Sequence, residues 1–320
     1  MTPDVVVLGA GIAGLTSAIR LAEAGFPVRM LARERPENTV SSVAAALWHP
    51  FRAEPPDRVL AWSRASYAVY AAEAADPDSG VIMRPLLELY RHEAPWPSWG
   101  EALPDLHRAP PPVGYTTAFA GTVPVIESPI YLARLEARLQ AHGIGVEIED
   151  VPSLDALVQP NRLVVVCVGL AARDLLRDDA LYPIRGQVVR VTNPGVTRVL
   201  LDEGDAEALT YIIPRSADCI LGGTTQEGVW DTAPDPAVTD AILARAQRLE
   251  PALLDAEVLE VRVGLRPGRT CVRLEAEQQP DGSAVIYNLG HGGSGYTLAW
   301  GCADEVVASV QAFAGSRRVV

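Results

Sequence analysis

The 320-residue chain is predicted to adopt an α/β fold in which a doubly wound layer is interleaved with a mixed-sheet α+β layer. Three observations predict it. A short apolar strand at residues 4–8 runs into a glycine-rich turn and a helix, apolar strands return at 162–169 and 284–289, and two long excursions of a different pattern lie between them. Alternating strands and helices are typical of a parallel sheet, and the excursions are long enough for a second domain.

Composition and charge narrow the classes of function. Hydrophobic residues make up 48% of the chain and charged residues 21%, and no apolar stretch approaches the roughly 18 residues that cross a bilayer. The net charge of −13 disfavours nucleic-acid binding, which needs a basic surface. Because neither end of the sequence carries a secretory or peroxisomal signal, we expect a cytoplasmic protein with no nucleic-acid and no membrane partner.

The four cysteines predict no metal site, because their spacing is far from any metal-binding pattern. Cys167 and Cys302 lie in apolar runs and are expected to be buried as small hydrophobic residues. Cys219 and Cys271 each lie in a strand-like segment. A disulfide between these two stays an open alternative, although such bonds are uncommon in the cytosol.

The turn after the first strand carries the dinucleotide fingerprint G-x-G-x-x-G, followed by a helix predicted over residues 16–24. Gly9 would permit a tight turn, Gly11 would let the main chain approach a pyrophosphate, and Gly14 would let helix and strand pack closely. The helix N-terminus would then present free N–H groups to the phosphates. A glycine-rich turn without a ligand is the alternative, and the correct order of the flanking elements makes it the weaker one.

The second parallel strand is predicted at residues 28–32, and the residues after it bear on the choice of nucleotide. A fingerprint of this kind is followed by an acidic residue that binds the adenosine ribose. Glu34 fits this position approximately, but Arg33 precedes it, and an arginine here would suit a phosphorylated ribose. A plain surface charge is an equally good interpretation of Glu34.

Residues 39–50 pass from small to apolar residues and end in Trp48, His49 and Pro50. The alanines at 44–46 predict the start of a helix whose small side chains would let a flat ring system approach the main chain. From Pro55 onward, prolines and tryptophans become frequent, which indicates that the chain leaves the regular alternation of strands and helices.

The rest of the chain returns to that alternation twice. Helices are predicted at 128–141, 235–249 and 296–313, and strands at 146–148, 162–169, 186–191, 211–214, 219–223, 257–263 and 284–289. The predicted domains are a nucleotide-binding domain from 1–50, 129–178 and 258–320, and a substrate-binding domain from 51–128 and 179–257.

A second glycine-rich turn, residues 290–295, joins the last strand to the last helix. Two such turns at opposite ends of the sequence can converge on one elongated ligand, the first turn at its pyrophosphate and the second at its other end. A flavin dinucleotide has the length and shape that this arrangement requires.

With these segments in place, the chain resembles the D-amino-acid oxidase family of flavoproteins over nearly its whole length. The resemblance is carried by V-V-L-G-A-G-I-A-G-L at 6–15, V-A-A-A-L-W-H-P at 43–50, R-G-Q-V-V-R-V at 185–191, Y-I-I-P at 211–214, L-G-G-T-T-Q at 221–226, G-L-R-P at 264–267 and G-H-G-G-S-G-Y-T at 290–297. The arginine-proline and histidine-glycine segments are the most specific. The resemblance implies FAD as the cofactor, held in a doubly wound Rossmann-like domain, with a mixed sheet that roofs the substrate. Because no cysteine is convincingly placed for covalent attachment of the flavin, we expect the FAD to be non-covalent.

The resemblance also implies roles for individual residues. Arg266 would clamp the substrate carboxylate, Tyr211 would share it, and the Gly293 carbonyl would receive the substrate amine; these three are the predicted catalytic residues. His49 would lie beside the substrate as a positioning residue, and Leu47, Ile213 and the small Ser294 would leave an apolar, roomy side-chain pocket. The predicted cofactor-binding residues are Gly9, Ala10, Gly11, Ile12, Gly14, Arg33, Glu34, Ser41, Ala45, Ala46, Leu47, Val151, Arg266, Gly292, Gly293, Gly295, Tyr296 and Thr297.

The implied activity is oxidative deamination of neutral D-amino acids to 2-oxo acids, ammonia and hydrogen peroxide, by hydride transfer from Cα to the flavin N5. Oxygen would be the second substrate, and a homodimer is one open state of assembly. The chain departs from the family pattern at two places: residues 200–207 contain no counterpart of a lid tyrosine, and Arg33 stands at the position of the usual ribose acid, with Glu34 next to it. In addition, Thr225 stands where D-aspartate oxidases carry an additional arginine. A glycine- or sarcosine-type oxidase, a D-aspartate oxidase (disfavoured) and a catalytically idle nucleotide-binding protein are the alternatives.

Without the resemblance, each side chain has a plainer interpretation. Arg266 could form a structural ion pair, Tyr211 could be a half-buried strand aromatic, and His49 and His291 could be structural histidines. An arginine between a leucine and a proline at a strand end is awkwardly placed for a surface ion pair, and with the resemblance included we expect Arg266 to be functional.

Overall fold

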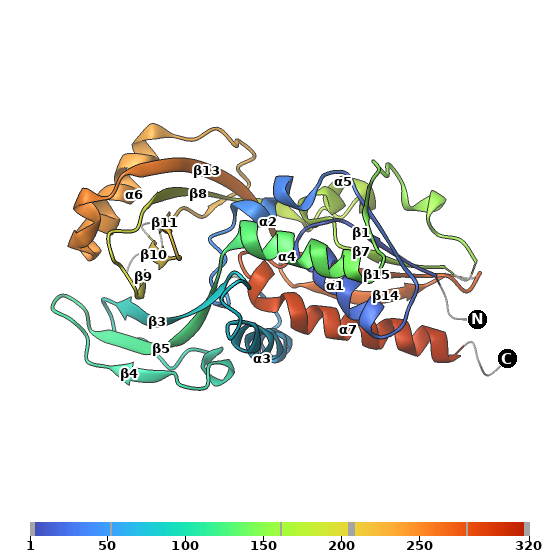
Figure 1. The fold of residues 1–320 in the computed structure, drawn as a ribbon, viewed down its shortest axis with the longest axis horizontal. Helices are drawn as coiled ribbons and strands as arrows, with labels where there is room; N and C mark the ends of the chain where they lie inside the picture. The colour runs from blue at the N-terminus through green and yellow to red at the C-terminus, as the bar shows by residue number, and fades with distance from the viewer. Residues whose placement is uncertain (1–3, 52, 161, 204–208, 280, 317–320) are drawn as a thin grey trace.

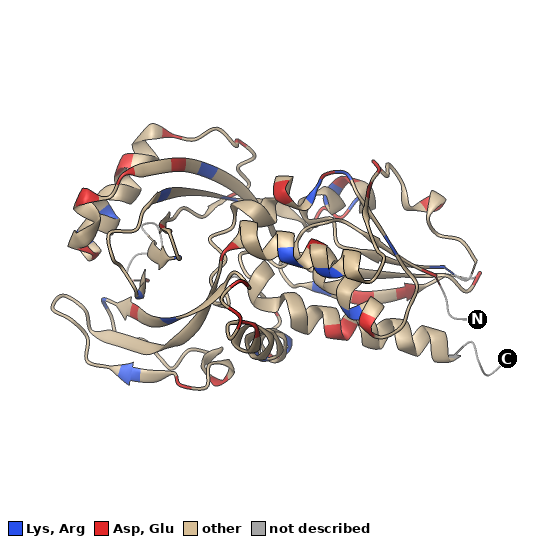
Figure 2. Cartoon of the chain, in the orientation of Figure 1, with Lys and Arg blue, Asp and Glu red and all other residues tan. Residues whose placement is uncertain are grey.

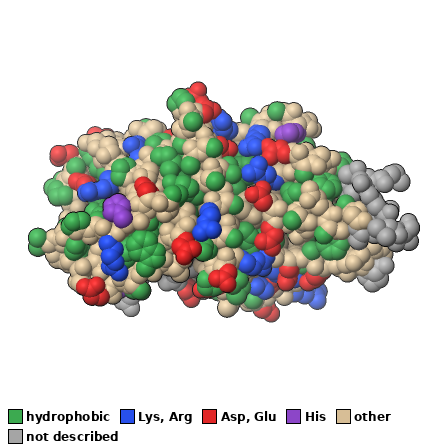
Figure 3. All heavy atoms as spheres, turned by 90° about the horizontal axis from the view of Figure 1, so that it is seen from below, with side chains coloured by type: hydrophobic (Ala, Val, Ile, Leu, Met, Phe, Trp, Pro, Cys, Tyr) green, Lys and Arg blue, Asp and Glu red, His purple; other side chains and the backbone are tan. Residues whose placement is uncertain are grey.

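The computed structural model describes residues 4–51, 53–160, 162–203, 209–279 and 281–316. The described chain forms an elongated molecule in which two β-sheets lie side by side, with the smaller sheet near both chain ends (Figure 1). The largely parallel smaller sheet, the mixed larger sheet and the helices between their strands confirm the predicted α/β class. Acidic and basic side chains are distributed over both parts (Figure 2), and they are interspersed on the face shown in Figure 3.

The smaller sheet has six strands in the order β14-β15-β7-β1-β2-β6, and only the edge pair β14–β15 is antiparallel. Its strands are β1 (Asp4–Leu8), β2 (Val28–Ala32), β6 (Val146–Ile148), β7 (Arg162–Val166), β14 (Arg273–Gln278) and β15 (Ala284–Leu289).

The central strand β1 is apolar on both faces because helices and loops cover both sides of the smaller sheet. Val5 and Val7 pack into the main hydrophobic core, and the alternate residues Val6 and Leu8 pack into a second core on the opposite face. A strand that is buried on both sides appears in the sequence as a continuous apolar run, and β1 could therefore be predicted from the sequence.

The helices are α1 (Ile12–Glu23), α2 (Val40–Val43), α3 (Pro56–Glu73), α4 (Ser128–Ala141), α5 (Ala172–Leu176), α6 (Pro236–Leu249) and α7 (Gly295–Ser316). The described residues also form five short 3₁₀ helices: η1 (Pro36–Asn38), η2 (Gly100–Ala102), η3 (Leu154–Ala156), η4 (Gly169–Ala171) and η5 (Pro251–Asp255). Helix α1 packs against α7 and α4, and α7 also packs against α3. In the described part of the chain, no helix combines the length and apolar character needed to span a membrane.

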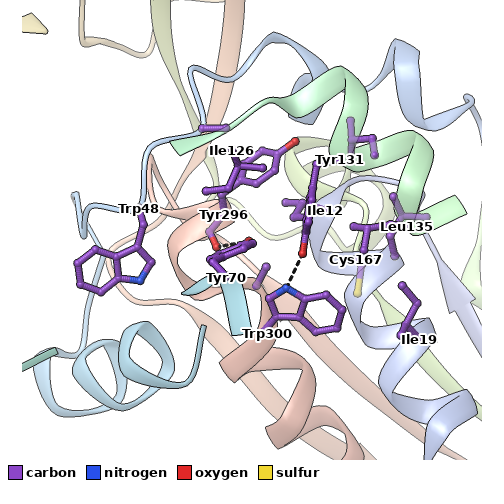
Figure 4. Close-up of a cluster of buried hydrophobic side chains, with 14 of the residues drawn as sticks. Ile12, Ile19, Trp48, Tyr70, Ile126, Tyr131, Leu135, Cys167, Tyr296 and Trp300 are labelled. Atoms are coloured by element: carbon purple, nitrogen blue, oxygen red, sulfur yellow. Dashed lines mark hydrogen bonds between the residues drawn. The ribbon is translucent and has the colours of Figure 1, made fainter. Parts of the chain in front are cut away.

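The core between these helices contains hydrogen-bonded aromatic side chains (Figure 4). The Trp300 Nε1–H donates to the Tyr131 hydroxyl at 2.8 Å, and the Tyr70 hydroxyl donates to the Tyr296 carbonyl oxygen at 2.9 Å. Because the polar atoms of these rings are paired, the aromatic surface can be buried without an unsatisfied donor. This core fixes the start of α7, which borders the cavity described below.

The larger sheet has nine strands in the order β12-β8-β11-β10-β9-β3-β5-β4, with β13 also paired to β8. Its strands are β3 (Val81–Tyr90), β4 (His107–Ala109), β5 (Thr117–Ile126), β8 (Tyr182–Thr192), β9 (Val199–Asp202), β10 (Thr210–Pro214), β11 (Asp218–Gly222), β12 (Gln226–Glu227) and β13 (Val258–Gly268). Only β3 and β9 pair in parallel, so the sheet is mixed.

The two sheets draw on alternating parts of the sequence. The chain enters the larger sheet between residues 81 and 126, returns to the smaller sheet, and enters the larger sheet again between 182 and 268. The domain bounds stay a prediction, and strand pairing bears on one of them. Residues 258–268, which the sequence places in the nucleotide-binding domain, form β13 and pair with β8 of the larger sheet along their length.

Three local predictions need correction. Helix α1 begins at Ile12 and therefore contains Gly14. The long helix α3 lies where the sequence predicts irregular chain, because the proline that suggests a break stands in its first turn, where no N–H is needed. The alanines at 44–46 do not start a helix: the Ile126 N–H donates to the Ala46 carbonyl oxygen at 2.8 Å, and Ala46 has a φ of 56°.

Candidate active site

A cavity of about 610 Å³ lies between the two sheets and is lined by both glycine-rich turns. Strands β8, β10 and β13 of the larger sheet form its other walls. Its size is that of a site for a cofactor or small ligand. We call the part next to the first glycine turn the dinucleotide end and the part next to β10 and β13 the substrate end.

The first glycine turn closes so tightly that side chains are excluded from it. Gly9 has a φ of 110°, and a Cβ on it would lie 2.5 Å from the Cys167 carbonyl oxygen. A Cβ on Gly14 would lie 1.8 Å from the Gly9 carbonyl oxygen, so the first turn of α1 can pack on the strand only through a glycine. Gly14 does not line the cavity itself.

The N-terminus of α1 points a main-chain donor at Ser41. The Ile12 N–H donates to the Ser41 Oγ at 3.0 Å, and a Cβ on Gly11 would lie 3.0 Å from that same oxygen. Both Ser41 and the turn residues line the cavity. The glycine, the hydroxyl and the helix N-terminus together form a cradle of hydrogen-bond donors that suits a phosphate group.

Further along the dinucleotide end, Arg33, Glu34 and Val151 line the cavity. The Arg33 Nε and the Glu34 Oε1 are 3.6 Å apart, and both side chains are exposed. The pair places one donor group and one acceptor group at the mouth of the cavity, where a ribose and its base could be held.

The second glycine turn and the alanine segment both line the cavity. Their lining residues are Gly292, Gly293, Gly295 and Tyr296 from the turn, and Ala45, Ala46 and Leu47 from the alanine segment. The small residues bring main chain to the cavity surface. The Tyr296 hydroxyl donates to the Ser41 carbonyl oxygen at 2.9 Å and so links the start of α7 to the segment that precedes the alanines.

Arg266 reaches the substrate end from β13 by lying across a glycine of the neighbouring strand. A Cβ on Gly186 of β8 would lie 2.4 Å from both terminal guanidinium nitrogens of Arg266. The Arg266 Nη1 donates to the Thr224 carbonyl oxygen at 3.0 Å. The glycine and this carbonyl hold the guanidinium in the cavity wall, where its remaining donors can bind a carboxylate in a two-point arrangement.

The ring of Tyr211, on β10, likewise lies against glycines, in this case two of them. A Cβ on Gly222 would lie 2.1 Å from the Tyr211 ring, and one on Gly223 would lie 2.6 Å from it. Burial raises the pKa of the Tyr211 phenol, and the charge and hydrogen bond of Arg266 only partly offset this. The phenol therefore stays protonated and can donate a hydrogen bond to the anion that Arg266 attracts.

His49 also lines the substrate end, and a carboxylate lies behind it. The His49 Nε2 is 3.2 Å from the Glu88 Oε1, and the Tyr90 hydroxyl donates to the same oxygen at 2.8 Å. The His49 ring packs edge-on against Trp99, with ring centroids 4.9 Å apart. Main-chain contacts to Thr297 complete the seat, because the His49 N–H donates to the Thr297 Oγ1 at 3.0 Å.

His291, on the second glycine turn, is buried beside an amide. Its Nε2 is 2.9 Å from the Asn288 Oδ1. Burial lowers the pKa of the His291 imidazole to about 4, so this histidine is neutral at physiological pH. This environment agrees with a structural histidine, one of the two interpretations open from the sequence.

The cavity brings together nearly all the residues that the sequence nominates. Two exceptions are Gly14 and Thr297, whose hydroxyl instead bonds the main chain of His49. The expectation for Ser294 is wrong: its side chain is buried and its Oγ donates to the Phe51 carbonyl oxygen at 2.8 Å, so it leaves no room in the cavity. Residues 204–207 of the predicted lid region lie outside the described residues.

Several lining residues were missed by sequence reasoning. They are Phe51, Gly186, Leu201, Glu203 and Leu209. Gly186 stands in a quoted segment, but a lone glycine in a strand does not reveal which side chain crosses it. Glu88 was missed because an acidic residue within an apolar strand gave no indication of its partner 39 positions away.

Cysteines supply no reactive group to this site. Cys167 lines the cavity, but burial raises the pKa of its thiol to about 12, which keeps it protonated. Cys219 and Cys271 are both free thiols, so the alternative of a disulfide between them is not realised in the structure.

Comparisons with known proteins agree with this geometry. The profile of a family described as FAD dependent oxidoreductase matches residues 4–309. The chain is 50% identical over 307 residues to a D-amino-acid oxidase of Rubrobacter xylanophilus, covering 95% of this chain and 94% of that protein. It is 43% identical over 307 residues to a D-amino-acid oxidase of Streptomyces coelicolor, covering 94% and 95%. The glycine oxidase structure of Geobacillus kaustophilus matches its fold with a TM-score of 0.79, at 18% identity and covering 97% and 95% of the two chains.

Proposed function

The chain belongs to the D-amino-acid oxidase family of FAD-dependent oxidoreductases, and on this premise we propose that it oxidises neutral D-amino acids. FAD is its cofactor, which confirms the resemblance read from the sequence. The products of such a reaction are a 2-oxo acid, ammonia and hydrogen peroxide, with oxygen as the second substrate. The substrate preference and the roles of individual residues are the new content of the proposal.

The residues of the cavity fit FAD. The cradle at Gly11 and Ser41 would hold the pyrophosphate, Glu34 and Val151 would border the adenosine, and the small residues of the alanine segment would admit the flat ring. When bound, FAD supplies the acceptor for the hydride that leaves the substrate Cα and passes the electrons on to oxygen. The protonated thiol of Cys167 is no nucleophile toward the ring, so we expect FAD to be held without a covalent bond.

The observation that carries the proposal is the pair of Arg266 and Tyr211 at the substrate end of the cofactor cavity. A guanidinium and a protonated phenol on adjacent parts of one wall recognise a carboxylate with charge-assisted hydrogen bonds. Fixing that carboxylate also fixes the direction of the Cα–H bond, so orientation contributes a large part of the rate. Gly293 also lines the cavity, and its carbonyl would accept a hydrogen bond from the substrate amine.

Neutral side chains suit the remaining space. Leu47, Leu201, Leu209 and Ile213 make this part of the wall apolar. Among the described lining residues, Arg266 is the only arginine outside the dinucleotide end, and Glu203 adds a negative charge. A second carboxylate on the substrate would find no cation, so D-aspartate is disfavoured.

Anaerobic bleaching of the flavin absorbance tests the proposal. We expect D-valine and D-phenylalanine to bleach the holoenzyme rapidly, whereas L-valine, sarcosine and D-aspartate should act at least about 100-fold more slowly, as expected when a buried charge or contact is unmatched. A preference for sarcosine or glycine would favour the alternative amine oxidase, and a D-aspartate preference would overturn the specificity. If no amine bleached the flavin, the remaining interpretation would be a catalytically idle flavoprotein.

Two accompanying proposals concern the setting of the reaction. We expect a cytoplasmic enzyme, and a homodimer is its proposed state of assembly. Size-exclusion chromatography coupled to light scattering measures the second, and a monomeric mass would reject it.

A further inference from the structure

His49 lines an apolar part of the cavity, yet its side-chain partner is the buried carboxylate of Glu88. Glu88 lies on β3, and its side chain is only 1% exposed. One oxygen contacts His49 and Tyr90, whereas Oε2 is buried with no hydrogen-bond partner among the described residues. A buried carboxylate is costly unless a cation is near, so a positive charge on His49 would be stabilised by this position.

The chemistry of the substrate end creates a use for such a histidine. An amino acid arrives as a zwitterion, and its ammonium nitrogen has no lone pair to support loss of hydride from Cα. The nitrogen must therefore lose a proton before hydride can leave, and a group beside the bound amine can accept that proton.

The titratable and charged groups around His49 and the substrate end come from several elements. Glu88 and Tyr90 lie on β3, Glu203 follows β9, Tyr211 lies on β10 and Arg266 on β13. The phenol of Tyr211 is protonated and the guanidinium is permanently charged, so neither can accept a proton. His49 is the group whose neutral form has a free lone pair and whose charged form already has a matched carboxylate.

Building on the proposed function, we propose that His49 accepts the proton of the substrate ammonium group and that Glu88 is the positioning residue that holds it. In this step an N–H bond of the ammonium breaks, its electron pair stays on nitrogen, and an N–H bond forms at the His49 Nδ1. The Nε2–H meanwhile donates to the Glu88 Oε1. Nδ1 is the ring nitrogen for which the described residues provide no hydrogen bond, and it is therefore free for the substrate.

The electrostatics of His49 support this geometry. Burial by itself lowers the pKa of the imidazole, but the hydrogen bond and charge of Glu88, together with the charge of Glu203, outweigh it and raise the pKa. Neutral His49, the form that can accept a proton, therefore predominates only above this raised pKa, and kcat/KM should fall as the pH drops through it. An amide in place of the imidazole would leave the enzyme dependent on substrate that is already deprotonated.

The pH profile of kcat/KM for D-valine tests the assignment in the holoenzyme. We expect the wild-type acid limb to follow His49, whereas His49→Gln should move that limb up to the pKa of the substrate's own amine. The loss should be about 100-fold at pH 7, in the range of a positioned acid–base group, and shrink to about threefold or less above that amine pKa. An equal loss at every pH would show a merely structural role and overturn the proposal.

Glu88→Gln tests the positioning residue, because it keeps the shape of the side chain and removes its charge. The His49 pKa should fall, moving the acid limb of kcat/KM to lower pH by about one unit. The matched control is Glu127→Gln, another buried carboxylate, which binds Ser216 and lies outside the cavity lining; its profile should match wild type. Absorbance of bound FAD reports whether each variant is folded.

A direct readout is the NMR titration of the His49 ring in protein with and without Glu88→Gln. We expect the wild-type midpoint to lie above that of the variant, and equal midpoints would remove Glu88 from the proposal. If Glu88→Gln does not fold, the His49→Gln profile decides alone. Wild-type protein that oxidises D-valine with a profile unchanged by His49→Gln refutes only the proton acceptor, whereas wild type that no D-amino acid reduces at any pH refutes the proposed function.

Discussion

The two ends of the cavity are built by different means. At the dinucleotide end, the main chain forms the wall, and its glycines come from one short stretch of sequence between β1 and α1. At the substrate end, side chains from β8, β10 and β13 and from the segment after α2 meet in space although they are far apart in sequence. Glycines serve both ends, but at the first they expose main chain, and at the second they make room for Arg266 and Tyr211. The comparison implies that the two ends can be damaged separately.

The largest expected effect separates them most clearly. Arg266→Leu should lower kcat/KM for D-valine by about 1000-fold, because the substrate carboxylate would be buried without its cation, while FAD stays bound. Steady-state kinetics and the flavin spectrum measure the two effects. Arg262→Leu on the same strand is the control, because Arg262 pairs with Glu260 and does not line the cavity. Near-normal kinetics of Arg266→Leu would contradict the assignment of Arg266 to substrate binding.

Acid should weaken the fold at the second glycine turn. His291 titrates at about 4 in the folded chain and near 6.5 when unfolded, so the folded state binds the proton less readily. The free energy of unfolding of the apoprotein should therefore be complete above about pH 6.5 and fall by up to about 3 kcal/mol as the pH drops toward 4.

Guanidinium unfolding at several pH values measures this dependence. His291→Gln should flatten it over the same interval, and substitution of the exposed His142 by Gln should leave it as in wild type. An equally steep decline in His291→Gln would show that other groups are responsible.

A glycine at the substrate end should matter as much as a side chain. In Gly186→Ala the new methyl group would overlap the Arg266 guanidinium and displace it, and we expect kcat/KM to fall by about 30-fold with FAD affinity unchanged. Gly145→Ala, where a Cβ meets open space, is the control. Loss of FAD from Gly186→Ala would contradict the separation of the two ends.

The smallest effect belongs to the dinucleotide end. Ser41→Ala removes one hydroxyl beside the proposed phosphate position, so the dissociation constant of FAD should rise about fivefold, equivalent to about 1 kcal/mol. Substrate kinetics at saturating FAD should be unchanged. Ser42→Ala controls for the loss of a neighbouring hydroxyl, since the Ser42 Oγ bonds Thr39 and does not line the cavity. Equal FAD affinities of the two variants would place Ser41 outside the phosphate site.

The same contrast explains what the sequence could predict. The α/β class, the family and the cofactor were predicted correctly, because a glycine fingerprint and doubly buried strands are local patterns. Strand β3 was not predicted: its arginine, proline and glutamate interrupt an apolar run, and its pairing with β5 and β9 compensates. The hydrogen bond of Ser294 to Phe51 and the contact of His49 with Glu88 were also not predicted, because both depend on contacts between distant segments.

The interleaving of the two sheets has a consequence for biosynthesis. Strand β15 must pair with β7 before the smaller sheet is whole, and the second glycine turn follows β15 directly. The two turns are about 280 positions apart, so a ribosome adding about 5–20 residues per second makes the second turn roughly 14–56 s after the first. The nascent chain lacks part of the cavity lining during that interval, so we expect stable binding of FAD to follow synthesis of the second turn.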